Sequence, residues 1–418
     1  MPDVRRTIDA IWRMSSPQLI ATLARTVRDV GLAEELAQDA FVAALEQWPR
    51  DGIPDNPAAW LTTTAKNKAV DLIRREHTRD AKYTAVAADL ATRPPDAPDA
   101  VVDDPIGDDL LSLVFVACHP VLPREARVAL TLRMVGGLST DEIARAFLVP
   151  SATLGQRISR AKRTLTEAQV PFEVPQPDEL PARLGAVLEV VYLVFNEGYT
   201  ATSGEDWVRR DLAEDAMRLG RVLAGLLPAE PEVHGLVSLM ELQASRFATR
   251  QGPDGAPILL EDQDRRRWDR LLITRGLAAL DRAAQLRRPL GPYCLQAAIA
   301  AQHARAATWE DTDWDAIRAL YDGLAQVAPS PVVALNRAVA VLMTDGPQAA
   351  LDELDAVGAD PRLARHHLYG AVRGDVLLRL GRRDEAASTL EQAAAHAPST
   401  RERRLLLERA AAAGERPA

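Results

Sequence analysis

The chain has 418 residues, of which 47% are hydrophobic and 5% aromatic, and its formal net charge is −9. Its length predicts two to four domains, and the abundance of Ala, Leu and Arg is typical of helical proteins. The negative net charge excludes a protein that coats nucleic acid with its whole surface, so a nucleic-acid site must be local.

Residues 8–49 predict two helices. The second, over 32–48, has small and apolar residues at one set of helical positions, including Leu36, Phe41 and Trp48. We expect this set to face a core. The positions expected to face outward are mostly acidic or amide residues: Glu34, Glu35, Gln38, Asp39 and Glu46.

Asn56 and Pro57 predict the start of another helix, as N-cap and first helical residue. That helix, over 58–76, has an apolar stripe and carries a local group of basic residues: Lys66, Lys68, Arg74 and Arg75. Residues 85–109 then change character, because they are rich in Pro, Ala and Asp. This composition predicts a flexible acidic linker.

Helices are expected again at 110–119 and 125–135, followed by a helix-turn-helix within 130–165. Ser139 followed three residues later by Glu142 is a capping-box pattern. Pro150 ends that helix, because the residue before a proline is pushed out of the helical region. Ser151 is expected to cap the second helix. Its apolar stripe consists of Leu154, Ile158, Ala161 and Leu165.

The opposite side of this second helix is basic. Residues 151–163 contain four basic residues, Arg157, Arg160, Lys162 and Arg163, and no acidic one. Together with Gln156 they suit the major groove of DNA, where arginine reads guanine and glutamine reads adenine. The alternative is a solvated basic face on an ordinary helix hairpin.

The rest of the chain is predicted to be helical and ends in an internal repeat. Gly374, Leu377, Gly381, Ala386 and Leu390 occupy the small and large positions of a tetratricopeptide-type helix pair. Residues 338–357 repeat this pattern about one unit earlier, and residues 295–328 form a possible third pair.

Signals for catalysis and metal binding are weak. Glu197 and the cluster Glu261, Asp262, Gln263 and Asp264 could do acid–base work, but no nucleophile–base pair or phosphate loop accompanies them. The two cysteines give neither a disulfide framework nor a zinc spacing. We therefore expect no catalytic residue, no metal and no cofactor. The N-terminus lacks the apolar core of a signal peptide and no apolar run could span a bilayer, so we expect a cytoplasmic protein.

Two basic helical modules joined by an acidic linker resemble the DNA-binding domains of bacterial RNA polymerase sigma factors of the extracytoplasmic-function class. Residues 31–48 (GLAEELAQDAFVAALEQW) are similar to the family's polymerase-docking helix. Residues 56–76 are similar to its −10 recognition helix and residues 138–165 to its −35 reader. Residues 191–204 and 259–270, followed by the repeats, resemble the sub-group with a large C-terminal extension.

The resemblance implies a fold and a domain order. The fold is all-α, with two small helical sigma domains, the second a helix-turn-helix, and a helical extension ending in tetratricopeptide-like repeats. The expected domains are a polymerase and −10 domain over 1–84, the linker over 85–109, a −35 domain over 110–170, a helical middle domain over 178–290, and the repeats over 291–418.

The resemblance also implies roles for single residues. The surface that binds the clamp coiled coil of the largest polymerase subunit would consist of Glu35, Leu36, Gln38, Asp39 and Phe41. The −10 element would be bound by Trp60, Thr64, Lys66, Asn67, Lys68, Arg74 and Arg75. The −35 element would be read by Gln156, Arg157, Arg160, Lys162 and Arg163. Gly155 departs from the family pattern, in which a basic or polar residue is common.

The function that follows is an alternative sigma factor, which binds core RNA polymerase and promoter DNA and catalyses no reaction itself. Its own extension would regulate it, in place of a membrane anti-sigma factor, and the extension could bind a regulatory protein. One alternative is a helix-turn-helix regulator with a peptide-binding repeat domain. The other is an enzyme that uses Glu197 and the Glu261–Asp264 cluster.

Overall fold

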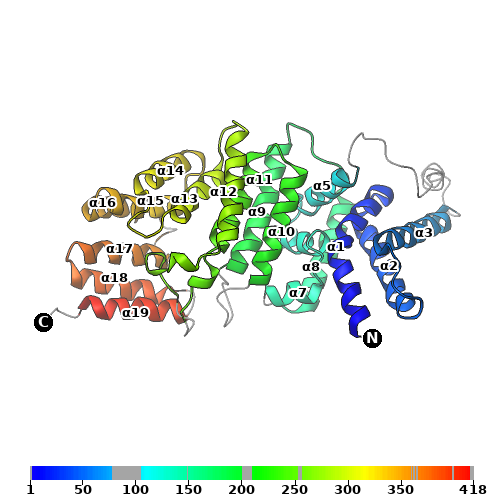
Figure 1. Cartoon of the computed structure of the whole chain (residues 1–418), viewed down its shortest axis with the longest axis horizontal. Coiled ribbons are helices and arrows are strands. Elements are labelled where there is room, and N and C mark those ends of the chain that lie inside the picture. The colour runs from blue at the N-terminus through cyan, green and yellow to red at the C-terminus, as the bar shows by residue number, and fades with distance from the viewer. Residues whose placement is uncertain are drawn as a thin grey trace. The chain divides into compact units, whose positions relative to one another are not determined.

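The computed structural model of the chain describes residues 2–77, 105–147, 149–199, 210–252, 257–358, 360, 363, 366–397 and 400–414. Regular structure in these ranges is helical, apart from an isolated β-bridge between Gln251 and Pro257 (Figure 1). The predicted all-α fold is confirmed. None of the helices described is both long and apolar enough to cross a membrane. The chain divides into two compact units, Met1–Val194 and Phe195–Ala418.

The described residues of the first unit form seven complete helices and most of an eighth. They are α1 (Pro2–Val27), α2 (Val30–Asp51), α3 (Pro57–His77), α5 (Pro105–Ala117), α6 (Arg124–Met134), α7 (Thr140–Ala146), α8 (Ser151–Glu167) and α9 (Leu180–Tyr199), which continues into the second unit.

Local capping signals start α2 and α3. The Asp29 carboxylate caps α2 by accepting a hydrogen bond from the backbone N–H of Leu32 at 2.8 Å. Asn56 caps α3 through the N–H of Ala59 at 3.1 Å, which confirms the expected start of that helix. Such caps satisfy backbone donors that have no partner inside the helix.

The helix-turn-helix consists of α7 and α8. Ser139 and Glu142 form both hydrogen bonds of the predicted capping box. The predicted stripe of Leu154, Ile158, Ala161 and Leu165 is the buried side of α8. The expectation that Ser151 caps α8 is wrong, because the extended residue Pro150 occupies the cap and Ser151 already lies in the helix, with no side-chain cap bond.

Helix α5 is central to the first unit because it is apolar on nearly all sides. It packs on α1 and α6, and a guanidinium N–H of Arg183, from α9, donates to the carbonyl oxygen of Phe115 at 3.0 Å. The helix begins at Pro105, earlier than the expected residue 110, since proline suits the first helical position. The predicted acidic linker, up to residue 104, lies outside the described residues.

The second unit continues with helices that pack on their neighbours in the chain. They are α10 (Arg210–Leu226), α11 (Pro231–Ala244), α12 (Arg270–Gln285), α13 (Pro292–Arg305), α14 (Trp314–Val327), α15 (Pro331–Thr344), α16 (Pro347–Gly358), α17 (His367–Arg379), α18 (Arg383–Ala395) and α19 (Thr400–Gly414). Short 3-10 turns η2 (Phe247–Thr249), η3 (Leu260–Asp262) and η4 (Arg265–Arg267) separate α11 from α12.

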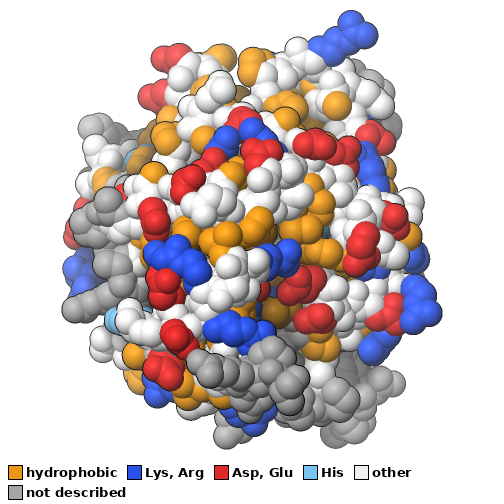
Figure 2. Space-filling view, turned by 90° about the vertical axis from the view of Figure 1, so that its left-hand side faces the viewer, with side chains coloured by type: hydrophobic (Ala, Val, Ile, Leu, Met, Phe, Trp, Pro, Cys, Tyr) orange, Lys and Arg blue, Asp and Glu red, His pale blue; other side chains and the backbone are white. Residues whose placement is uncertain are grey.

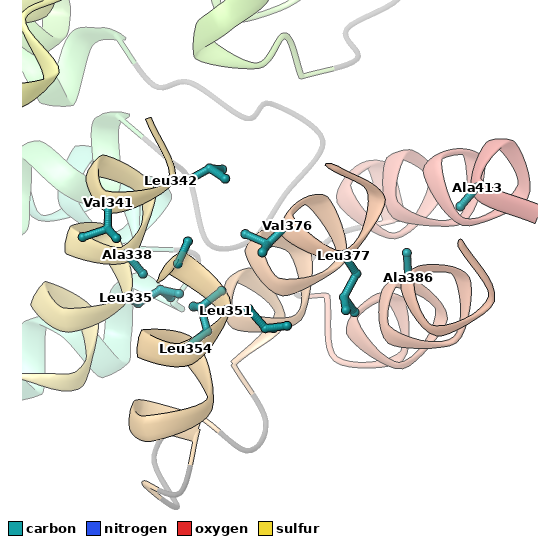
Figure 3. Close-up of a cluster of buried hydrophobic side chains, with 11 residues drawn as sticks. Leu335, Ala338, Val341, Leu342, Leu351, Leu354, Val376, Leu377, Ala386 and Ala413 are labelled. Carbon is teal, nitrogen blue, oxygen red and sulfur yellow. The ribbon is translucent and has the colours of Figure 1, made fainter. Parts of the chain in front are cut away.

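The predicted repeat corresponds to the helix pairs α15–α16 and α17–α18, and one buried cluster contains side chains from all four helices (Figure 3). Small residues let the helices approach closely. A Cβ at Gly374 would lie 2.7 Å from the Leu390 side chain, so a larger residue there would force α17 or the Leu390 side chain to shift. Each pair buries its apolar face against the next, as in other repeat proteins.

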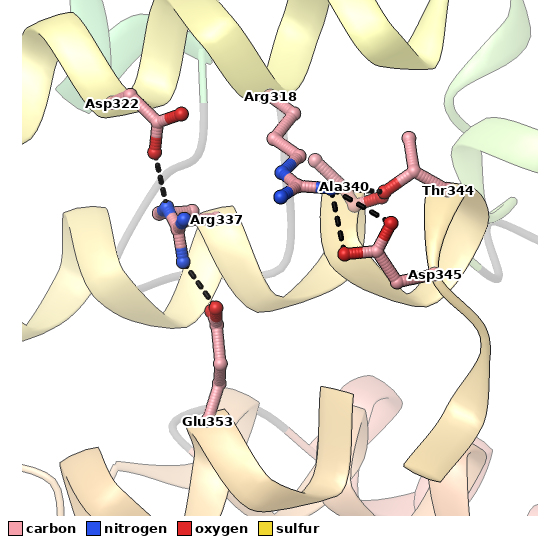
Figure 4. A network of polar contacts seen from close by, with 7 residues as sticks. All are labelled: Arg318, Asp322, Arg337, Ala340, Thr344, Asp345 and Glu353. Carbon is pink, nitrogen blue, oxygen red and sulfur yellow. Dashed lines mark hydrogen bonds and ion pairs between the residues drawn. The ribbon is translucent and has the colours of Figure 1, made fainter. Parts of the chain in front are cut away.

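Ion pairs add to the apolar contacts between these helices. The guanidinium of Arg337 on α15 bridges Asp322 on α14, at 2.6 Å, and Glu353 on α16 (Figure 4). Arg318 donates to Asp345 at 2.6 Å. Acidic and basic side chains are also mixed over the face of the molecule drawn in Figure 2, rather than separated by sign.

Candidate nucleic-acid interface

The outer side of α8 carries the predicted base-reading residues. Because the apolar stripe is buried, the opposite side of the helix faces solvent. Gln156, Arg160 and Arg163 are exposed there and Arg157 is half-buried. Arg163 pairs with Glu167 one turn later, at 3.4 Å, in a pair that is open to solvent. This side therefore presents an amide and three guanidinium groups from one rigid helix.

Lys162 is oriented differently from the other four predicted −35 residues. Its side chain is 19% exposed, and its ammonium group forms an ion pair with Glu34 of α2. Glu34 itself is 2% exposed, so the expectation that it faces solvent is wrong. The reason is tertiary: α8 packs against the first turns of α2 and covers this position.

Glu34 has a second cationic partner in Arg133 of α6, whose Nε donates to Glu34 Oε1 at 2.6 Å. Gln38 also donates to this oxygen, at 2.6 Å. Burial raises the pKa of the Glu34 carboxyl, but Lys162 and Arg133 outweigh that effect and hold the pKa below its ordinary value. The carboxylate is therefore charged inside the unit.

The predicted docking surface on α2 divides into exposed and buried residues. Glu35 and Asp39 are exposed and Gln38 is half-buried, whereas Leu36 and Phe41 are 4% and 5% exposed. The Phe41 ring meets Trp12 edge-on, with ring centroids 4.4 Å apart. In this structure Leu36 and Phe41 therefore belong to the buried side of α2.

Two apolar residues belong to the same exposed side and were not singled out from the sequence. Val42 is 52% exposed and Leu45 is 43% exposed. Val42 lies one helical turn beyond Asp39 and two beyond Glu35, so the 3.6-residue period places it on their side of α2. That spacing is the signal that could have identified it.

The predicted −10 residues lie along α3. Trp60, Thr64 and Asn67 recur at helical spacing, with Trp60 and Thr64 half-buried and Asn67 exposed. The Trp60 ring also contacts Trp48 of α2, with centroids 5.4 Å apart. The other predicted −10 residues differ from one another in exposure and in ion pairing. Lys66 is exposed, Lys68 pairs with Asp39 at 3.6 Å, and the side chains of Arg74 and Arg75 lie outside the described residues.

Two of the carboxylates that suggested an enzyme have different surroundings in the described part of the chain. Glu261 lines a cavity of about 370 Å³ in the second unit, and Glu197 is not among its lining residues. Glu261 lies 3.8 Å from the Arg379 guanidinium, and Asp264 caps η4 through the N–H of Arg266. Among the described residues, no group of three His, Cys, Asp or Glu side chains could hold a metal ion.

Comparison with known families matches three segments of the chain. Residues 11–79 match Sigma-70 region 2, and residues 112–165 match Sigma-70 region 4. The first match covers most of α1 to α3, and the second covers most of α5 to α8. Residues 183–284 match a family of unknown function, DUF6596.

Three curated proteins show how far the similarity extends. An uncharacterized protein of Rhizobium meliloti (strain 1021) is 46% identical over 94% of this chain and 93% of its own length. "ECF RNA polymerase sigma factor SigK" of Mycobacterium ulcerans is 33% identical over 34% of this chain and 75% of its own length. "Probable ECF RNA polymerase sigma factor SigI" of Mycobacterium tuberculosis is 28% identical, over 40% and 57% respectively.

Proposed function

The chain belongs to the extracytoplasmic-function family of RNA polymerase sigma factors and has a C-terminal extension, and we propose that α2, α3 and α8 divide the family's tasks among them. Helix α2 docks on core polymerase, α3 binds the −10 element and α8 reads the −35 element. The observation that carries this proposal is α8, whose buried stripe leaves Gln156, Arg157, Arg160 and Arg163 on the open side. Such a helix fits the major groove.

Base reading by α8 is tested with Arg160→Ala. If Arg160 contacts a guanine with two hydrogen bonds, its loss weakens binding by about 1–3 kcal/mol and relaxes specificity at one base pair. If it contacts phosphate, binding falls evenly across sequences and the salt dependence becomes shallower. Binding to a series of −35 variants separates these outcomes. Arg305→Ala, which removes an exposed arginine from α13, is the control, and equal behaviour of the two variants would contradict the assignment.

Polymerase docking by α2 is tested by reversing one charge. Glu35 and Asp39 are exposed acids beside the apolar Val42 and Leu45, a surface that complements a basic partner with some apolar area. We propose the clamp coiled coil of the largest subunit as that partner, with Gln38 at the same surface and with Leu36 and Phe41 holding α2 in place. Asp39→Arg is expected to reduce retention on immobilised core polymerase. Asp71→Arg, at an exposed acid of α3, controls for net charge, and full retention of Asp39→Arg would refute the docking face.

For the −10 element we propose that α3 captures an unpaired base in opened DNA. Trp60, Thr64 and Asn67 share one side of the helix, and Lys66 and Lys68 flank it with positive charge, together with Arg74 and Arg75 further along. Aromatic and polar groups hold single-stranded bases while basic groups follow the phosphates. Trp60→Ala would then reduce promoter opening, measured by permanganate reactivity of thymines, more than it reduces binding to duplex −35 DNA.

Regulation by the extension is the remaining part of the proposal. The described residues of the second unit form their own buried clusters, and Glu197 is not among the residues that line the cavity beside Glu261. We assign this unit a regulatory role, with a protein partner as one route of control. In vitro transcription with core polymerase compares the full chain with residues 1–199. A change in transcript yield, in either direction, supports regulation, and equal yields remove it. The sigma factor itself needs no cofactor, since the polymerase supplies the chemistry.

A further inference from the structure

The cavity of about 370 Å³ in the second unit takes no part in the tasks proposed for α2, α3 and α8. Its walls come from α13, α14, α15, α17 and α19, and from η3, which lies beside α17 (Figure 1). Because all these elements belong to the second unit, the cavity is a feature of that unit alone. Its volume falls within the range of small-molecule sites, about 300–1,000 Å³.

Most of the cavity wall is apolar. Helices α15 and α17 contribute Val339, Leu342, Met343, Leu368 and Val372. Leu368 is 49% exposed, so part of this apolar surface is in contact with water. A ligand that covers the wall removes this surface from water, which is favourable. The shape and lining of the cavity therefore suit a small molecule with an apolar body.

Three aromatic side chains, Trp309, Trp314 and Tyr321, also line the cavity. Trp309 and Trp314 meet edge to face, with ring centroids 4.6 Å apart, and the His303 ring stacks on Trp309 at 6.0 Å. Burial and nearby arginines lower the pKa of His303 to about 3, so this imidazole adds no positive charge at neutral pH. The faces of tryptophan and tyrosine rings attract organic cations.

One carboxylate of the cavity wall is weakly compensated. Glu261 of η3 is 36% exposed and lies 3.8 Å from the Arg379 guanidinium, which is beyond hydrogen-bonding distance. Arg379 is shared with Asp375, at 3.4 Å, and Asp375 also pairs with Arg409 at 3.0 Å. Burial and the charges of Asp375 and Asp262 raise the pKa of the Glu261 carboxyl above its ordinary value. A positive group on a ligand would supply the missing compensation.

We propose that this cavity binds a small amphipathic organic cation, either an amine or a quaternary ammonium compound. Its apolar body covers the side chains of α15 and α17, and its cationic group pairs with Glu261 and contacts the aromatic rings. An anion is disfavoured, because Arg379 and Arg409 already pair with Asp375. The cavity binds this ligand whether or not the extension regulates transcription.

Calorimetric titration of the full-length protein with octyltrimethylammonium tests the charge requirement. Octanoate and 1-octanol carry an apolar chain of similar length with an anionic and a neutral head, and all three are used below the concentrations at which they aggregate. We expect one cation to bind per chain, about tenfold or more tightly than either comparison compound. Equal affinity for the cation and octanoate, or a lack of saturable binding, overturns the proposal.

The variant Glu261→Gln removes the charge and keeps the shape of the side chain. We expect it to weaken octyltrimethylammonium binding by about threefold to tenfold, as for a partly exposed ion pair, and to leave 1-octanol binding unchanged. Glu310→Gln changes an exposed acid of the same unit that does not line the cavity, and it controls for net charge. Equal weakening by the two variants would contradict the role given to Glu261.

A second variant, Trp309→Leu, tests the aromatic rings. Leucine keeps apolar surface at this half-buried position but has no ring face for a cation. We expect the variant to lose more affinity for octyltrimethylammonium than for 1-octanol, with circular dichroism confirming that it is folded. Equal losses for both ligands would show that the ring provides apolar surface only. Because these titrations measure binding to the second unit, their failure leaves the tasks proposed for α2, α3 and α8 intact.

Discussion

A carboxylate inside a protein is costly unless cations and hydrogen bonds compensate it, and Glu34 shows how this compensation makes a contact depend on pH. Its pKa is lowered in the folded state, because Lys162 and Arg133 outweigh the effect of burial. A group whose folded pKa is lowered stabilises the fold above its unfolded pKa and loses this contribution as the pH falls through the folded value. The pairing of Glu34 with Lys162 and Arg133 therefore stabilises the fold fully at neutral pH.

The first prediction concerns this pH dependence. Between about pH 5 and pH 3, wild-type protein is expected to lose more of its free energy of unfolding than Glu34→Gln, because the amide cannot be protonated in this range. Urea denaturation at several pH values, followed by circular dichroism, measures the difference. Glu35→Gln, which changes an exposed carboxylate, should follow the wild type. If the free energy of unfolding changes with pH in the same way for the wild type and Glu34→Gln, then Glu34 does not titrate as described.

At the scale of elements, two glycines illustrate how one residue type serves different needs. Gly137 precedes α7 with φ of +72°, and a Cβ there would lie 3.3 Å from both Cα and O of Arg13 on α1. Gly155 lies within α8, and a Cβ there would meet no atom within 4 Å. The first glycine is required by backbone conformation and by close approach of α1, whereas the second is not.

The second prediction follows from this pair. Gly137→Ala is expected to destabilise the protein by about 1–2 kcal/mol, because alanine is strained at positive φ and crowds α1. Gly155→Ala is expected to stabilise it by about 0.5–1 kcal/mol, since alanine favours the helix interior. Urea denaturation of both variants provides the comparison. The same sign of change for both would mean that the described turn geometry does not govern stability.

Elements with local signals were predictable from the sequence, and contacts between distant elements were not. Ser139 with Glu142 and the position of Pro150 set the limits of α7 and the start of α8 through neighbouring residues alone. The helical spacing of the apolar residues also identified the buried stripe of α8. The burial of Glu34 depends on Lys162, which is far away in the sequence. The spacing of residues within α2 therefore could not predict that burial. Ser151 was misassigned because serine is a preferred cap residue, whereas Pro150 has the extended backbone of the cap in this structure.

At the scale of the whole molecule, α9 connects the two units. Its first part belongs to the first unit, where Arg183 donates to the Phe115 carbonyl and Glu189 lies 3.3 Å from Arg124. Its last residues, from Phe195 onward, belong to the second unit. From the sequence, the expected −35 domain ends at residue 170 and the middle domain begins at residue 178, and these limits remain predictions.

The third prediction uses this helix to place a truncation. Residues 1–199 retain α9 and its contacts with α5 and α6, whereas residues 1–177 lose them. The hydrogen bond contributes about 1 kcal/mol and the solvent-exposed ion pair about 0–1 kcal/mol. Together they correspond to about 2–8 °C in melting temperature for a domain of this size. We expect 1–177 to melt lower than 1–199 by at least that amount in a thermal scan. Equal melting temperatures would show that α9 contributes nothing to the first unit.

The positions of the two cysteines have a consequence for redox chemistry. Cys118 lies in the first unit and Cys294 in the second, 1% and 0% exposed. Burial raises the pKa of the Cys118 thiol to about 11, and burial and Glu232 also raise that of Cys294. Both thiols are therefore protonated and shielded from peroxide and alkylating reagents at neutral pH. Each becomes reactive only when its own unit opens, so alkylation rates at the two sites report the opening of each unit separately, without an introduced probe.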